Sequence, residues 1–158
     1  MPARIVTQNL CNTAVYPGFL KRLKRFLYEP GNSFRRATMG NMTEQTFLFH
    51  KDVFMPAKFK RPCYEGPLCY GPHARKESLT DKYGLIELPG SFHADGAVLI
   101  EAEATVSGKV VKQVWRTRLD ETRDLILVIT SSGFVKTVWV NLANDLHATL
   151  NKAKYVRH

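Results

Sequence analysis

The clearest alternation of apolar and polar side chains lies in residues 98–140. Residues 98–106 and 109–118 alternate on either side of a Ser-Gly turn, which predicts a β-hairpin. Residues 125–130 begin with five apolar side chains, as expected for a central strand, and residues 134–140 alternate again. Four consecutive strands joined by short turns predict an antiparallel meander.

Alternation also predicts which side chains share a face. In the first strand one face carries Ile100, Ala102, Ala104 and Val106. In the second strand Val111, Gln113, Trp115 and Thr117 oppose Val110, Lys112, Val114 and Arg116. In the last strand Phe134, Lys136, Val138 and Val140 oppose Val135, Thr137 and Trp139. These sets assume strict alternation with a period of two residues.

The residues before the meander predict less regular structure and one helix. Residues 42–72 are rich in Pro, Phe and Tyr without a steady period, so we expect irregular structure with one or two short strands. Pro72 and Gly84 then bracket residues 73–83, which predict a short helix. The expected fold is α+β, an antiparallel meander of at least four strands with one or two helices on one face, plus a basic N-terminal helix.

Positive charge is concentrated near the N-terminus. The 158 residues include 23 Lys and Arg and 14 Asp and Glu, a formal net charge of +9. Residues 1–41 hold seven of the basic side chains and one acid, so this leader carries +6 and residues 42–158 carry only +3. We therefore divide the chain into a basic leader, residues 1–41, and one α+β domain, residues 42–158.

Within the leader, residues 16–28 predict a short amphipathic helix with four cations outside its apolar side: Lys21, Arg22, Lys24 and Arg25. Such a helix can lie on a nucleic acid, lie on an anionic membrane surface, or pack on the protein with its charges solvated. The surplus of positive charge favours a polyanion, nucleic acid first, with these four cations in contact with it.

Composition narrows the class of protein further. No apolar run approaches the roughly 20 residues that cross a bilayer, so we expect no integral membrane association. The three cysteines are too few and odd in number for a disulfide framework, and no secretory signal is recognisable, so we expect a cytoplasmic protein. Cys63, Cys69 and His73 are zinc-binding residue types, but their spacing is unusual and no fourth ligand is near, so we predict no metal and no cofactor.

Histidines and cations in the second half of the chain suggest phosphodiester chemistry. Cleavage of RNA needs a base, an acid, and cations for the charge that builds on phosphorus. His73 is suited to the first two roles, although a solvated helix face is the alternative interpretation. The strands and the segment after them add Lys112, Arg116, Arg118, Lys136, Thr137, Asn141, Asp145 and His147. Alternating cations are also common on exposed strands without any catalytic role.

The helix with a histidine and a basic residue, followed by VVKQVWRTRLDETRDLILVITSSGFVKTVWVN, resembles the barnase, EndoU, colicin and RelE ribonuclease superfamily over residues 73–150. The same sequence pattern is also similar to that of small bacteriophage proteins. The resemblance implies a metal-independent endoribonuclease, a hydrolase, whose catalytic residues would be His73, His147 and Arg116. It implies that Arg75, Thr137 and Asn141 bind substrate, and we add Lys112 and Lys136 from the cations of the strands.

Three hypotheses remain open from the sequence. The first is a cytoplasmic RNA-binding, RNase-like protein, located in the host cytoplasm if a phage encodes it. The second is a non-enzymatic phage protein that binds nucleic acid or a host protein through the leader. The third is a structural subunit of a larger particle, with the aromatic residues 47–70 buried against a neighbour. The sequence leaves the oligomeric state open.

Overall fold

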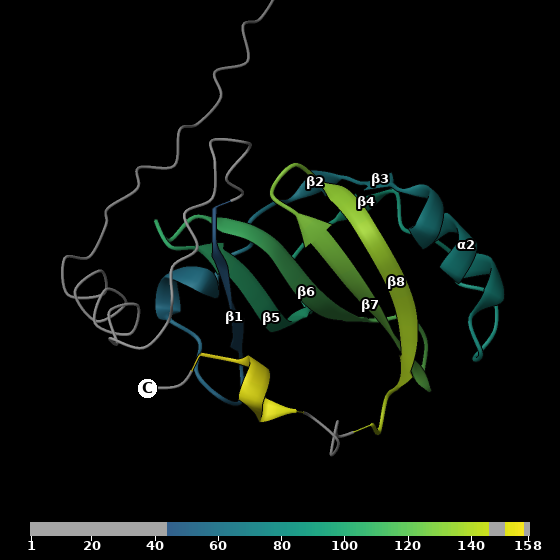
Figure 1. Cartoon of the computed structure of the whole chain (residues 1–158). Coiled ribbons are helices and arrows are strands. Elements are labelled where there is room, and N and C mark those ends of the chain that lie inside the picture. Colours follow the sequence, from purple (N-terminus) through teal and green to yellow (C-terminus); the bar gives the residue numbers. More distant parts are fainter. Residues whose placement is uncertain (1–43, 146–150, 157–158) are drawn as a thin grey trace, which may run out of the picture. The chain divides into compact units, whose positions relative to one another are not determined.

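The computed structural model describes residues 44–145 and 151–156, and six of the strands in this part form one large sheet (Figure 1). Its strands are β1 (Thr46–His50), β3 (Cys69–Tyr70), β5 (Val98–Thr105), β6 (Val110–Arg118), β7 (Arg123–Thr130) and β8 (Phe134–Leu142). The six strands lie in the order β1-β5-β6-β7-β8-β3. All neighbours are antiparallel except β3 and β8, which are parallel.

The other elements are short. β2 (Gly66–Pro67) and β4 (Ser91–Phe92) form a two-stranded sheet, and α2 spans Pro72–Thr80. Two single turns of 3₁₀ helix are η1 (Ala57–Phe59) and η2 (Lys152–Lys154). Within the described ranges, no helix has the length and apolar character needed to cross a membrane.

The predicted α+β fold is wrong. The described part of the chain is mostly β, α2 is its one α-helix, and the sheet is mixed. Strands β5 to β8 do follow one another as antiparallel neighbours, but β1 and β3 extend the sheet beyond both ends of this meander. Both added strands come from residues 42–72, where their pairing depends on partners far along the chain. The predicted basic helix and the rest of the leader lie outside the described residues, so the boundary at residue 41 stays a prediction.

The two faces of the sheet differ in composition. The inner face carries Trp115, Leu125 and Leu127, which pack beneath α2, the loop residue Ile86 and Phe92 of β4. The outer face carries a smaller apolar cluster, Ile100, Val114, Ile126 and Val128, with Trp139 packed against it. The ion pairs Lys112–Glu103 and Arg116–Asp124 lie on the same face as this smaller cluster. The main core is the larger cluster on the inner face.

Three register shifts interrupt the large sheet, and two of them, in β5 and β8, move side chains away from their predicted faces. Leu99 pairs with Trp115 and Glu101 with Val114, which leaves Ile100 as an extra residue in β5 that joins the outer cluster. In β8 the extra residue is Lys136, and Val135 is fully buried in the inner core together with Val138 and Val140. A bulge places two residues of one strand opposite one of its neighbour, so strict alternation predicts the wrong face beyond it.

Helix α2 ends earlier than predicted because Asp81 leaves the helix to bind other backbone groups. Pro72 lies in the first turn, as expected, but the helix stops at Thr80 and not at Tyr83. The Asp81 carboxylate accepts hydrogen bonds from the N–H groups of Tyr83, at 2.8 Å, and of Val140 on β8, at 3.1 Å. This side chain thereby fastens the end of α2 to the sheet.

The residues after position 150 return to the other edge of the sheet. The Val156 N–H donates to the Leu48 carbonyl of β1 at 3.0 Å. The Tyr155 ring packs on buried His50, with centroids 4.9 Å apart, and its hydroxyl donates to Glu101 at 2.7 Å. These contacts cover part of the edge of β1 that faces away from β5.

Candidate nucleic-acid interface

The predicted catalytic residues do not converge in the part of the chain that the structure describes. His73 lies exposed in the first turn of α2, where its Nδ1 is 3.7 Å from the Glu77 carboxylate. Arg75 is also exposed, and its Nε donates to the Tyr70 carbonyl at 3.1 Å. Both belong to the helix that covers the inner face. The position of His147 falls outside the described residues.

Arg116 lies on the opposite face of the sheet and is already engaged. Its Nε donates to Asp124 Oδ2 at 2.6 Å, and both side chains are largely buried. Its terminal nitrogens donate to the carbonyls of Leu142, Ala143 and Asp145 at 3.1, 3.1 and 3.2 Å. A phosphate could reach this guanidinium only by displacing these acceptors. The arrangement therefore favours a structural role for Arg116, which closes the turn after β8.

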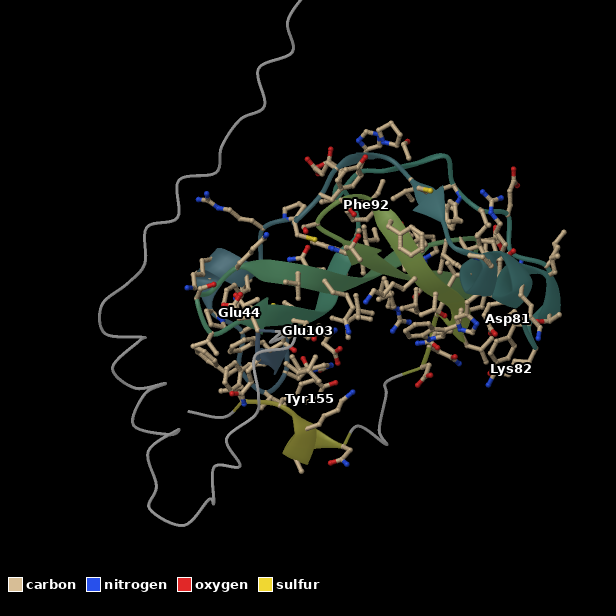
Figure 2. All side chains as sticks on the ribbon, turned by 45° about the horizontal axis from the view of Figure 1, so that its top comes forward. Glu44, Asp81, Lys82, Phe92, Glu103 and Tyr155 are labelled. Atoms are coloured by element: carbon tan, nitrogen blue, oxygen red, sulfur yellow. The ribbon has the colours of Figure 1, made fainter. Side chains whose placement is uncertain are left out.

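The predicted substrate-binding residues of the strands share the outer face with acids. The Lys112 ammonium is paired with the Glu103 carboxylate, which Figure 2 shows on the same side as Tyr155. Burial raises the pKa of Glu103, but hydrogen bonds from Lys112 and Thr46, together with the positive charges of Lys112 and Lys136, lower it overall. Lys112 is therefore already paired with an acid. Thr137 and Asn141 lie on the same face by their pairing with Val128 and Asp124.

A group of cations that the sequence analysis did not single out gathers at one end of the sheet. We call it the basic end, and it comprises Lys58, Lys60, Arg61 and Lys109. The Lys58 ammonium lies at the β5–β6 turn, since a Cβ added to Gly108 would be 2.8 Å from its Nζ. Lys109 follows Gly108 in that turn, and all four side chains are exposed. Figure 2 shows Glu44 on this side of the body and Asp81 on the far side.

One acid accompanies the basic end. The Glu44 carboxylate accepts a hydrogen bond from the Ser107 N–H at 3.2 Å. Hydrogen bonds from Ser107, and to a smaller extent the charge of Lys109, lower the pKa of Glu44, so it stays ionised at neutral pH. The four cations and this acid leave a local charge of about +3.

The loop that presents Lys60 and Arg61 is fastened to the inner face of the sheet. The fully buried Gln113 side chain of β6 makes hydrogen bonds to backbone groups of Phe59, Arg61 and Cys63. Phe59 is itself buried against Phe49, with ring centroids 4.8 Å apart. The sequence did carry a signal for this site, the run AKFKR at residues 57–61, which has three cations and no acid.

The two cysteines that the structure describes are free thiols. Cys63 is partly buried, and this burial raises the pKa of its thiol to about 11, so it stays protonated at neutral pH. Cys69 is exposed. Among the residues that the structure describes, no three His, Cys, Asp or Glu side chains are grouped as metal ligands would be.

Comparison with known proteins gives the chain no family. No protein-family model, no curated protein and no solved structure matches it. The resemblance to the ribonuclease superfamily therefore stays a prediction.

Proposed function

We propose that the protein is a non-catalytic nucleic-acid-binding module, with RNA as the first ligand to test, and that the basic end contacts the phosphate backbone. The observation that carries the proposal is the approach of Lys58 to Gly108, next to Lys109, with Lys60 and Arg61 exposed on the adjoining segment that Gln113 holds.

The charge distribution supports this choice of surface. The described residues contain 15 basic and 13 acidic side chains, a net charge of only +2. The basic end alone accounts for about +3, so the remainder of the described body is close to neutral. A polyanion is attracted to such a cluster of exposed cations. Neutralising Z phosphates with cations releases counterions, which makes the affinity fall steeply with salt.

The geometry favours binding over cleavage. The candidate base, His73, is on the helix that covers the inner face, whereas Arg116 is on the outer face and is held by Asp124. General acid–base catalysis requires the participating groups within hydrogen-bond reach of the same reacting atoms. A protein that only binds the backbone needs no such convergence.

The proposal is tested with the full chain by fluorescence anisotropy on a labelled RNA of about 20 nucleotides, between about 50 and 300 mM KCl. In the test variant, the four cations of the basic end are replaced by Gln: K58Q, K60Q, R61Q and K109Q. In the matched control, four exposed lysines elsewhere are replaced: K51Q, K76Q, K82Q and K152Q. Both variants lose the same net charge.

We expect the basic-end variant to lose roughly a hundredfold in affinity at about 100 mM salt, with a salt slope smaller in magnitude by about 3, because up to four phosphate contacts are lost. The control should lose less than about threefold. Equal losses in the two variants, or no binding by the natural chain, would contradict the proposal. RNA that is shortened during the titration would contradict its non-catalytic part.

The leader is tested separately. Replacing Lys21, Arg22, Lys24 and Arg25 by Gln in the full chain measures the contribution that the sequence predicts for them. If these cations also contact phosphates, the salt slope should fall again, by up to about 3 more.

A further inference from the structure

We propose that Gln113 is the positioning residue of the basic end: its side chain holds the loop of residues 59–63 so that Lys60 and Arg61 are presented to a phosphate backbone in one preset arrangement. This inference rests on the proposed function and assigns it a residue that touches no ligand.

The Gln113 amide is buried and fully used. It lies on β6, is 0 % exposed, and points to the inner face. Its Oε1 accepts from the Cys63 N–H at 2.8 Å and from the Trp115 indole N–H at 3.0 Å. Its Nε2 donates to the carbonyls of Phe59 and Arg61 at 2.9 and 2.8 Å. A primary amide has two N–H donors and an oxygen that takes two hydrogen bonds, so every position is occupied.

The neighbouring indole fixes the orientation of this amide. An indole N–H can only donate, so the atom of Gln113 that faces Trp115 must be the oxygen. The NH₂ group then points to the two loop carbonyls. Reversing the amide would place donors against the N–H groups of Trp115 and Cys63 and an oxygen against two carbonyls. The hydrogen bonds therefore specify one arrangement of the loop.

The backbone groups that Gln113 binds are close in sequence to Lys60 and Arg61. The two carbonyls belong to the residues on either side of Lys60, and the Cys63 N–H lies two residues beyond Arg61. The backbone of the loop is thus tied to β6 while the side chains of Lys60 and Arg61 extend into solvent. Ordering a loop and its side chains upon binding weakens affinity, and a loop that is ordered during folding avoids this loss.

The absence of charge on Gln113 also favours binding of a polyanion. An acidic side chain at this position could also bind N–H groups, but its charge would offset one of the nearby cations and it could not donate to two carbonyls when ionised. A neutral amide holds the loop without weakening the field of the basic end.

The test compares Gln113→Met, which keeps a similar volume without hydrogen bonds, with Val138→Ala, which weakens the same inner core through buried Val138 of β8. Two measurements are made on the full chain. Hydrogen exchange of the Cys63 N–H, relative to amides of β7, reports the order of the loop. Affinity for the labelled RNA across the salt series reports binding.

For Gln113→Met we expect exchange of the Cys63 N–H to accelerate at least about tenfold relative to β7, and affinity to fall about tenfold at every salt concentration. The salt slope should stay the same, because the number of cations is unchanged. Val138→Ala should change neither measurement when compared below its unfolding transition. If Gln113 had only a structural role, both variants would lose stability, and Gln113→Met would not differ from Val138→Ala in exchange of the Cys63 N–H or in affinity.

Several results would overturn the inference. Unchanged exchange of Cys63, or unchanged affinity in Gln113→Met, removes the positioning role while the proposed function stands. Equal loss of affinity in Val138→Ala removes it as well. Failure of the natural chain to bind RNA overturns the proposed function and this inference together. If Gln113→Met does not fold, Gln113→Asn, which shortens the side chain by one methylene, must show the same faster exchange and parallel loss of affinity.

Discussion

Gln113 and Arg116 lie on the same strand, β6, and each holds the backbone of a distant loop from opposite faces of the sheet. Gln113 binds the loop of residues 59–63 on the inner face through a neutral amide. Arg116 binds the carbonyls of residues 142, 143 and 145 on the outer face through a charged guanidinium, which is paired with Asp124.

The difference separates a structural charge from charges that remain for a ligand. Buried Asp124 pairs with Arg116 and also with Arg118, whose Nε lies 3.1 Å from its Oδ1, so the charge of Arg116 is partly offset within the sheet. Gln113 is neutral, so the side chain that holds the loop does not offset the charges of Lys60 and Arg61. A cation in a buried pair and a cation on a tethered loop therefore serve different purposes in this sheet.

The strongest challenge to this comparison is the removal of Asp124. We expect Asp124→Ala to destabilise the protein by about 3–5 kcal/mol, because it leaves the largely buried Arg116 guanidinium without its counter-charge. Urea unfolding followed by tryptophan fluorescence measures the loss. The double variant Arg116→Leu/Asp124→Leu should recover part of it. A loss below about 1 kcal/mol in Asp124→Ala would show that Arg116 is not dependent on the pair.

The matching change on the inner face should cost less. We expect Gln113→Met to lower the free energy of unfolding by about 2 kcal/mol, since the buried Trp115 indole N–H loses its acceptor while the loop groups can turn towards water. Because the amide is neutral, this loss should be the same at low and high salt. A loss that shrinks with added salt would indicate that the loop is held by charge and not by the amide.

Lowering the pH tests the contact between buried His50 of β1 and Tyr155, in which neither Gln113 nor Arg116 takes part. Burial lowers the pKa of His50 below its ordinary value of 6.5, and the opposing charges of Asp52 and Glu101 offset this only in part. The folded state then binds its proton less readily than the unfolded state, so stability is full above about pH 6.5 and falls as the pH drops below it. Urea midpoints should decline from pH 7 towards pH 5. His50→Gln should flatten this decline, and an equal decline in that variant would assign it to other groups.

The smallest expected effect belongs to His73. Its side chain is exposed and its pairing with Glu77 within α2 is weak, so His73→Ala should change stability by less than about 0.5 kcal/mol. The same variant tests the ribonuclease hypothesis in an RNA cleavage assay, together with His147→Ala. Cleavage by the natural chain that both substitutions abolish would restore that hypothesis and contradict the non-catalytic role.

Sequence patterns were sufficient for the part of the fold that depends on neighbouring strands. Residues 98–106 and 109–118 form the expected hairpin, and the apolar strand that begins at Leu125 lies between β6 and β8. The bulges at Ile100 and Lys136 could not be predicted, because an extra residue changes the face without changing the composition. The strands β1 and β3 depend on pairing across long stretches of chain, which local alternation does not report.

The candidate site was less accessible to sequence reasoning. Gln113 was placed in the correct alternating set with Trp115, but its hydrogen bonds to residues 59–63 are visible only after folding. Lys58 and Lys109 are far apart in sequence and come together at Gly108. His73 and Arg116 were predicted to act together, but the structure places them on opposite faces of the sheet. The sequence could not show this, because it does not reveal which face of a sheet a helix covers.

The hydrogen bond between Val156 and Leu48 has a consequence for the order of events during synthesis. Strand β1 emerges early from the ribosome, whereas Val156 is added only after every other described strand has been made. Until then the outer edge of β1 presents unpaired backbone groups, which are a template for pairing with other chains. A nascent chain that stalls before Val156 therefore keeps this edge of β1 open to pairing with other chains, which favours aggregation.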